Sequence, residues 1–335
     1  MAIKLMRGAL NLSKWALWAV GALALLLTAL VATPLVRPPE MRSVSESRHN
    51  VDLSNLPAVE RFQARDGTML GFRHYPASGP ATGRGAIFIH GSSGSSATVN
   101  HAVSAALAVR GVETWAIDIR GHGASGTRGD IGYVGQLEDD LADFVAFIRK
   151  TGPDLPLTLI GHSAGGGFAL RIAGSPLQSL FVRTVLLAPY LGYDAPSSRQ
   201  DAGGWASADL PRILGLLALR KLGINCCEAL PTLAFAVPPN SEKILVPVYS
   251  DRLMRNFATR GYRTDLAAAT RPLTIISGAD DEMMLADKYE ETAHAVAPSV
   301  DVKLIDGINH MGLVTLPKAV SAVADDVATR GIGPS

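Results

Sequence analysis

The most informative segment of the chain is Leu155-Pro156-Leu157-Thr158-Leu159-Ile160-Gly161-His162-Ser163-Ala164-Gly165. Its first six residues form a short apolar run, which is typical of a strand buried on both faces of a sheet, and residues 164–173 have a helical pattern. A G-x-S-x-G sequence between a strand and a helix produces a tight turn that projects the serine hydroxyl, because the small flanking residues let the two elements approach. We therefore predict that Ser163 is a nucleophile at a strand-to-helix turn.

Strand and helix patterns alternate on both sides of this turn, which predicts an α/β fold with a mostly parallel central sheet and helices on both faces. The expected strands are short apolar or alternating runs at 59–64, 69–75, 85–91, 112–118, 155–161, 184–189, 271–278 and 300–306. The expected helices are at 97–110, 137–148, 164–173, 283–295 and from about 316.

The alternation is interrupted between about residues 190 and 270. A segment of that length is too long for a loop, so we predict an inserted helical lid over the carboxyl edge of the sheet. Its main helix is expected within Leu-Pro-Arg-Ile-Leu-Gly-Leu-Leu-Ala-Leu-Arg-Lys-Leu-Gly-Ile, residues 210–224. Lid and sheet together form one predicted domain, residues 57–335.

A serine hydroxyl needs a base to take its proton, and at this type of turn the chain order is serine, acid, histidine. His310 directly follows the strand at 300–306 and is predicted to be the base. His162 belongs to the turn itself, and His294 lies inside a predicted helix, so neither competes well for this role.

The acid that orients the base is predicted to be Asp281, which follows the strand at 271–278. Its neighbour Asp280 is an alternative because two adjacent residues can exchange places in a turn. Asp194, after the preceding strand, is a third candidate.

The tetrahedral intermediate of such a reaction needs two hydrogen-bond donors for its oxyanion. We predict the backbone N–H groups of Ala164, directly after the nucleophile, and of Ser92, in the loop after the strand at 85–91. Ser93 is the less favoured neighbour, and the serine-rich loop 92–98 could instead be a plain connection.

Residues 15–36 contain no charge and are long enough to cross a bilayer as a helix. We predict an uncleaved transmembrane anchor, preceded by a short basic segment at 1–14 and followed by a polar linker at 37–56. The alternatives are a cleaved signal peptide, which would need small residues at its cleavage site, and a buried soluble helix. Basic residues flank the run almost equally, and the absence of acidic residues before it weakly favours an extracytoplasmic catalytic domain, which makes the protein a single-pass membrane protein.

The composition excludes several classes of function. The chain has 31 Lys and Arg against 30 Asp and Glu, which argues against nucleic-acid binding. The only cysteines, Cys226 and Cys227, are adjacent, too close for an ordinary disulfide, and form no zinc motif; we expect both to be buried. No metal or other cofactor is predicted, and the oligomeric state is left open.

Several motifs together resemble those of the α/β-hydrolase superfamily: His90-Gly91, Asp118-Ile119-Arg120-Gly121-His122-Gly123-Ala124-Ser125, the turn at 161–165, Gly278-Ala279-Asp280-Asp281 and His310. The resemblance covers about residues 60–330 and is greatest to the monoacylglycerol lipase, lysophospholipase and serine-aminopeptidase-like branch. It implies a hydrolase of carboxylic esters, with Arg120 and His122 in a structural turn. The serine-rich loop after Gly91 departs from the lipase pattern and leaves the shape of the acyl pocket open.

The predicted function is therefore a membrane-anchored serine esterase or lipase, with a small-molecule or lipid ester of the monoacylglycerol or lysophospholipid type as substrate. The lid helix would rest on the membrane through an apolar stretch beside basic residues, although packing on its own pocket is the simpler alternative. These residues are Leu210, Leu214, Leu217 and Leu222, with Arg212, Arg220 and Lys221. One rival is an aminopeptidase-like enzyme that binds the substrate amine through Glu228, Glu242 or Asp265; another is a non-catalytic binding protein on the same scaffold.

Overall fold

The eight predicted strands form one twisted sheet in the order β1-β2-β4-β3-β5-β6-β10-β11. The computed structural model describes residues 2–49, 51–98 and 100–329. β1 and β2 run antiparallel to their neighbours and the remaining strands are parallel, as Phe88 opposite Ile160 illustrates for β3 and β5. The strands are β1 (Glu60–Gln63), β2 (Met69–Tyr75), β3 (Arg84–Ile89), β4 (Val112–Ile117), β5 (Leu157–His162), β6 (Arg183–Leu187), β10 (Leu273–Gly278) and β11 (Asp301–Ile305).

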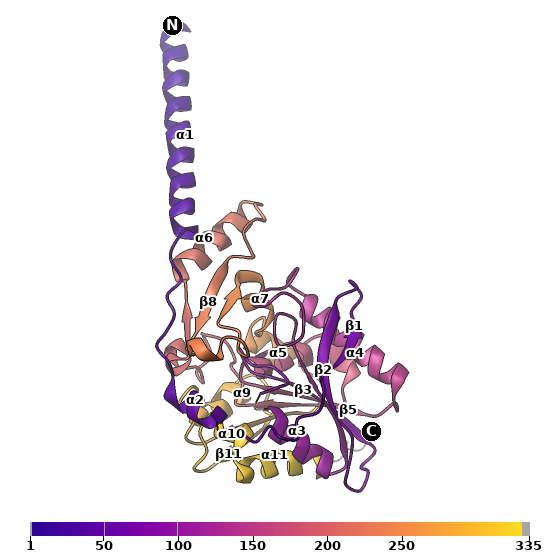
Figure 1. Ribbon diagram of the computed structural model, residues 1–335. Coiled ribbons are helices and arrows are strands. Elements are labelled where there is room, and N and C mark those ends of the chain that lie inside the picture. The colour runs from indigo at the N-terminus through magenta and orange to yellow at the C-terminus, as the bar shows by residue number, and fades with distance from the viewer. Residues whose placement is uncertain (1, 50, 99, 330–335) are drawn as a thin grey trace.

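Helices cover both faces of this sheet, as predicted (Figure 1). On one face α3 (Asn100–Val109) packs against α11 (Pro317–Thr329), and on the other α5 (Ala164–Ala173) packs against α8 (Tyr262–Ala268), with α4 (Gln136–Thr151) beside it. In α4 the residues of the predicted apolar face, including Leu137, Leu141 and Phe144, are buried. The central strands are buried on both sides, which explains their continuous apolar sequences.

The insertion between β6 and β10 contains more than the expected helix. α6 (Leu210–Lys221) begins where the Asp209 carboxylate accepts the N–H of Arg212. Beside it lies a three-stranded antiparallel sheet of β7 (Ala206–Ala208), β8 (Pro231–Phe235) and β9 (Val248–Ser250), followed by α7 (Asp251–Asn256). The prediction of a helical lid missed this sheet because its strands are only three to five residues long.

The N-terminal helix α1 (Ala2–Val31) projects away from the rest of the molecule and contacts it through α6 (Figure 1). Its segment Lys14–Val31 is long and apolar enough to cross a membrane, or to serve as a signal sequence, and only 6% of that segment is buried. The helix ends at Val31, five residues before the predicted end at Val36, because Pro34 lacks the backbone N–H that would continue it.

The segment predicted as a linker, residues 37–56, contains a short helix, α2 (Arg42–His49), which lies near α10 (Gly312–Thr315). One local expectation is wrong, because Cys226 and Cys227, expected to be buried, are both exposed in the loop that follows α6. A short apolar pair in a loop leaves too little pattern to show which way its side chains face.

Candidate active site

Ser163 lies at the turn between β5 and α5, in a backbone conformation that side chains rarely adopt (φ 55°, ψ −119°). The flanking glycines make this turn possible. A Cβ atom at Gly161 would lie 2.1 Å from the carbonyl oxygen of Gly165, and one at Gly165 would lie 2.3 Å from that of His90. The G-x-S-x-G sequence thus lets the turn form and places the serine side chain at the carboxyl edge of the sheet.

His310 and Asp281 are brought together from two neighbouring strand ends. His310 Nδ1 lies 2.8 Å from Asp281 Oδ2, and the side chains are almost completely buried. Asp281 Oδ1 also accepts the backbone N–H groups of Met283 and Met284, each at 2.8 Å. Burial raises the pKa of Asp281, but His310 and these two N–H groups lower it more, so the net pKa lies below the ordinary value.

The alternative acids are positioned differently. Asp280 and Asp194 are both exposed, and Asp194 lies 3.8 Å from Arg263. The helix expected at 283–295 begins later than predicted, with a short 3₁₀ turn at Ala286–Lys288 that continues as α9 (Tyr289–His294). The N–H groups of Met283 and Met284 bond to Asp281 and hold these two residues in the turn before the helix. His294 is in α9, where its ring bonds to the Val300 carbonyl.

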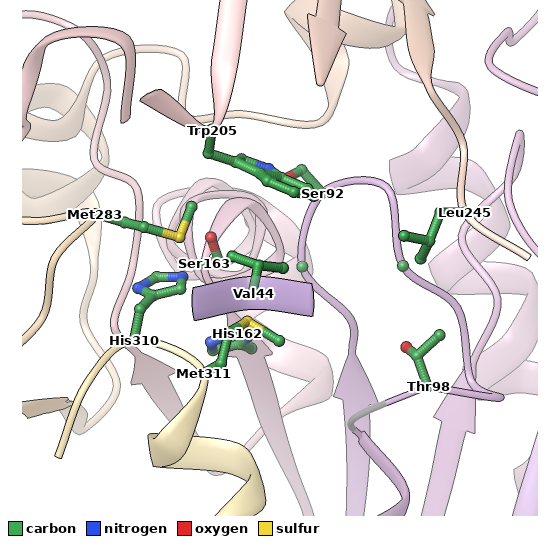
Figure 2. Close-up of a pocket in the computed structure, with 12 residues that line it drawn as sticks. Val44, Ser92, Thr98, His162, Ser163, Trp205, Leu245, Met283, His310 and Met311 are labelled. Carbon is green, nitrogen blue, oxygen red and sulfur yellow. The ribbon is translucent and has the colours of Figure 1, made fainter. Parts of the chain in front are cut away.

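Ser163 and His310 line the same pocket (Figure 2). Among the described residues no hydrogen bond joins the Ser163 hydroxyl to His310, so the hydroxyl would have to turn toward the ring for proton transfer; such bonds often tighten only when substrate is bound. The ring of His162 lies 4.9 Å from that of His310. Burial, together with His310, lowers the pKa of His162 to about 3, so His162 is neutral and adds no charge to the pocket.

Ser92 and Ala164 lie at the same edge of the sheet, and Ser92 lines the pocket. The Ser92 hydroxyl accepts a hydrogen bond from the indole of Trp205, in the insertion, at 2.9 Å. The Ser93 N–H, in contrast, donates to the hydroxyl of Tyr249 at 2.6 Å. Since that N–H is already occupied, the geometry favours the Ser92 N–H over the Ser93 N–H as the second oxyanion donor.

The loop that carries Ser92 is held by the insertion. Ser93 adopts a left-handed conformation (φ 66°), and its hydroxyl donates to the carbonyl of Val246 at 2.5 Å. The Tyr249 hydroxyl, which accepts the Ser93 N–H, also lies 2.5 Å from Nε2 of His122. Burial and the neighbouring His90 lower the pKa of His122 well below its ordinary value, so the tyrosine donates to a neutral imidazole.

The motif residues Arg120 and His122 therefore have structural contacts. Arg120 is buried in ion pairs with Asp140 at 2.7 Å and Asp66 at 2.9 Å, away from the pocket. His122 connects that turn to Tyr249. The run 118–125 supports the loop of Ser92 through His122 and Tyr249, and also directly, because Asp118 Oδ1 accepts the Ser96 N–H at 2.6 Å.

Replacing Tyr249 with phenylalanine is expected to lower kcat about tenfold to a hundredfold with little change in KM. The change leaves the Ser93 N–H and His122 Nε2 without partners and loosens the loop that presents the Ser92 N–H, and loss of one oxyanion donor costs about a hundredfold or more. Steady-state kinetics on a p-nitrophenyl ester measure the effect. Tyr75→Phe is the control, since Tyr75 is also a buried tyrosine bonded to a histidine, His101 at 3.1 Å, away from the pocket. Equal effects of the two variants would contradict this role.

Sequence reasoning missed four residues at the site. Glu282 accepts the backbone N–H of His310 at 3.0 Å, Trp205 and Tyr249 hold the loop of Ser92, and Val44 of α2 lines the pocket. Only Glu282 had a usable signal, its position beside Asp281. Among the described residues no group of three or more His, Cys, Asp or Glu side chains could hold a metal ion.

Solved structures with this fold include several ester hydrolases. A soluble variant of monoglyceride lipase from Saccharomyces cerevisiae, solved with a substrate analogue, is 18% identical, with a TM-score of 0.62 over 82% of this chain and 94% of that one. An esterase from Pyrococcus furiosus is 18% identical (TM-score 0.55, 89% and 100% covered). A bacterial membrane phospholipase A is 15% identical (TM-score 0.53, 97% and 99% covered).

No curated protein matches the sequence at a significant level. The model of one family, however, matches residues 84–314, which is more than half of the chain and includes the turn at Ser163, Asp281 and His310. That family is described as "Serine aminopeptidase, S33". With the sheet order and the strand-to-helix turn described above, this match shows that the chain belongs to the serine aminopeptidase S33 family of the α/β-hydrolase superfamily.

Proposed function

We propose that this protein is a membrane-anchored serine hydrolase that cleaves carboxylic esters with lipid-like acyl chains. Ser163 is the nucleophile, His310 the base, and Asp281 the residue that orients and stabilises the histidine. All three members of the triad are present, which favours an enzyme over a non-catalytic binding protein.

The observation that carries this proposal is the lining of the pocket. Five of its lining residues are apolar: Val44, Trp205, Leu245, Met283 and Met311. The others are Ser163, His162, His310, Ser92, Thr98 and two glycines. Such a surface suits an acyl chain. No carboxylate is among these lining residues, whereas a peptidase that binds a free amino terminus needs one.

The three acidic residues considered for such an amine site have other partners. Glu228 pairs with Arg255 at 2.6 Å, and Asp265 is fully buried against Arg260 at 2.7 Å. Glu242 pairs with Arg37. None of the three lines the pocket, so the ester hypothesis is favoured over the aminopeptidase-like one.

In the proposed reaction, the Ser163 hydroxyl attacks the ester carbonyl while His310 Nε2 takes its proton. The backbone N–H groups of Ser92 and Ala164 stabilise the oxyanion, and Asp281 stabilises the imidazolium. His310 then protonates the leaving alcohol, and an acyl-enzyme remains on Ser163. Water, deprotonated by His310, attacks the acyl carbonyl; the bond to Ser163 Oγ then breaks, His310 returns the proton to Ser163, and the acid is released.

Retention of α1 as an anchor is supported by its contacts with the insertion. The Thr33 hydroxyl donates to Asp209 at 2.7 Å, and Arg212 Nε donates to the carbonyl of Val31 at 2.9 Å. Both charged side chains are buried. A Cβ at Gly215 of α6 would lie 3.0 Å from Leu30, so the two helices are in close contact. Cleavage after Ala32 would remove the Val31 carbonyl from Arg212 and the packing of α1 against α6, while Asp209 and Arg212 would still pair with each other at 3.5 Å.

The outer face of α6 supports membrane contact next to the anchor. This face has four exposed leucines: Leu210, Leu214 and Leu222 are each more than half exposed, and Leu217 is 40% exposed. Exposed apolar residues that are scattered singly over a protein surface are normal and need no explanation. Arg212 and Arg220 do not join this face, because they turn inward to α1 and to Asp251. The lid is thus proposed to rest on the bilayer mainly through its leucines. The membrane phospholipase A that matches almost the whole chain, α1 included, is consistent with this arrangement.

We further propose that the catalytic domain faces the extracytoplasmic side, because no acidic residue precedes the apolar run; the basic residues on its two sides nearly balance and favour neither orientation.

The proposed function predicts that the full-length protein in detergent hydrolyses p-nitrophenyl esters at least about a hundredfold faster than aminoacyl-naphthylamides. A site built for the amine would lose much of its affinity for a substrate that lacks it, whereas an apolar pocket would not. Measuring kcat/KM for both substrate series decides between them. Faster cleavage of the naphthylamides would favour the peptidase. The orientation is tested separately, by labelling right-side-out vesicles with a membrane-impermeant fluorophosphonate: labelling of intact vesicles supports an extracytoplasmic domain, and labelling only after permeabilisation contradicts it.

A further inference from the structure

The helix α2 (Arg42–His49) connects the membrane helix to the active site. From the end of α1 the chain runs along the insertion, where Arg37 pairs with Glu242, and then forms α2 near α10 (Figure 1). Val44 is the single apolar residue of the sequence Arg-Ser-Val-Ser-Glu-Ser-Arg-His. Its side chain is only 4% exposed, although it belongs to a polar segment.

Val44 is buried in the pocket of Ser163. It lines the same cavity as Ser163, His310 and Met311, and Figure 2 shows it on its helix in front of the nucleophile. His162, at the end of β5, is the one residue of the described central strands that lines this pocket. The wall at Val44 comes from a segment that precedes the sheet in sequence and is joined to the membrane helix by only ten residues, 32–41.

With α2 in this position the cavity is small. The centres of water-sized molecules can occupy only about 40 Å³ of it, and the cavity is partly open to solvent. A short acyl group fits inside, whereas a chain of eight or more carbons extends beyond the enclosed part. Val44 belongs to the same packed core as the other apolar lining residues, but it is supplied by a short helix of otherwise polar sequence. It is therefore the wall residue that can move with the least disruption.

The docking of α2 is weak by its composition. Isolated helices of eight residues are unstable in water, and this one has one apolar side chain to bury. Within the helix Val44 is the only apolar side chain that holds it, beside the buried Ser45 and the half-buried Met41 that precedes the helix. An acyl chain that enters the pocket competes for the same space.

We propose that α2 forms a displaceable wall of the acyl pocket and that Val44 determines acyl-chain length. This inference rests on the proposed ester hydrolysis. With Val44 docked the site accepts short acyl groups, and a long acyl chain reacts only when it displaces α2. The segment that follows the membrane anchor thereby contributes a specificity residue to the active site, while the anchor itself attaches the enzyme to the membrane.

The test is the ratio of kcat/KM for p-nitrophenyl octanoate to that for p-nitrophenyl acetate, measured with the full-length protein in detergent micelles. Val44→Ala is expected to raise this ratio at least about tenfold, since one or two methyl groups in an apolar pocket change selectivity by that amount. Val44→Trp is expected to lower it. Val36→Ala makes the same substitution at a 67% exposed position of the segment 32–41, and it is expected to leave this ratio unchanged.

A second measurement does not depend on catalysis. In a background with Cys226→Ser and Cys227→Ser, the Val44→Cys variant is expected to react with a maleimide at least about tenfold more slowly than the Val36→Cys variant, because Val44 is buried and Val36 is exposed. Equal maleimide rates, or equal ester ratios in the wild type, Val44→Ala and Val44→Trp, would overturn the inference. If ester hydrolysis itself is absent while the maleimide rates differ as expected, the proposed function fails and the docking of α2 stands.

Discussion

The Ser163→Ala variant is expected to lose about a millionfold in kcat for ester hydrolysis, the scale seen when a triad nucleophile is removed. The residual rate would come from substrate binding and the oxyanion donors, which remain in place. The measurement is the burst and steady-state release of p-nitrophenol, with labelling by a fluorophosphonate probe as an independent readout. The wild type should be labelled in the membrane fraction and the variant should not.

This variant is well suited to the test because it should fold. Alanine keeps the Cβ atom that Ser163 already accommodates at its positive φ, and the close contacts of Gly161 and Gly165 are unchanged. Ser104→Ala is a matched control, since Ser104 is a fully buried serine in α3, outside the pocket. It should retain wild-type activity and labelling. Hydrolysis unaffected by Ser163→Ala would refute the proposed mechanism.

The central part of the molecule was predictable because its signals are local. Each buried parallel strand is a continuous apolar run, and the turn at Gly161 to Gly165 has a steric requirement that only small residues meet. His310 and Asp281 each directly follow a strand, and the carboxyl ends of parallel strands lie at one edge of the sheet, so their proximity followed from the order of the elements.

The parts that were missed depend on contacts between segments far apart in sequence. Trp205 and Tyr249 meet the loop of Ser92 across more than a hundred residues, and nothing in their own neighbourhoods indicates those partners. The short strands of the insertion have too few residues to show a period. Val44 is the clearest case, because a single valine in a polar segment has no periodicity, and its burial depends on the path of the linker from α1.

The Asp281→Asn variant is expected to lower kcat about ten-thousandfold while KM changes little. In the wild type the Asp281 carboxylate accepts a hydrogen bond from the Nδ1–H of His310, so Nε2 carries no proton and is free to act as a base. An asparagine can present its NH₂ group to the ring instead, which stabilises the wrong tautomer and gives no charge to stabilise the imidazolium. Initial rates at saturating ester concentration measure the loss in kcat. The rate of labelling by a fluorophosphonate probe is expected to fall in proportion.

The neighbouring residue provides the control. Asp280→Asn removes the same charge one position away, from an exposed side chain, while the backbone bond from the Asp280 N–H to the Ile308 carbonyl remains. It is expected to keep nearly the wild-type rate, and a larger loss in Asp280→Asn than in Asp281→Asn would reverse the assignment of the acid.

The pH dependence of stability tests the charge of Asp281 by a second route. The pKa of Asp281 is lowered in the folded state, so its carboxylate stabilises the fold above the unfolded pKa of about 4, and this contribution is lost as the pH falls through the lower folded value. The difference in the free energy of unfolding between the wild type and Asp281→Asn should therefore shrink when denaturant titrations are moved from pH 7 to below about pH 4. A constant difference would mean that the charge of Asp281 does not stabilise the folded state, and the same charge could not then be what holds the imidazolium.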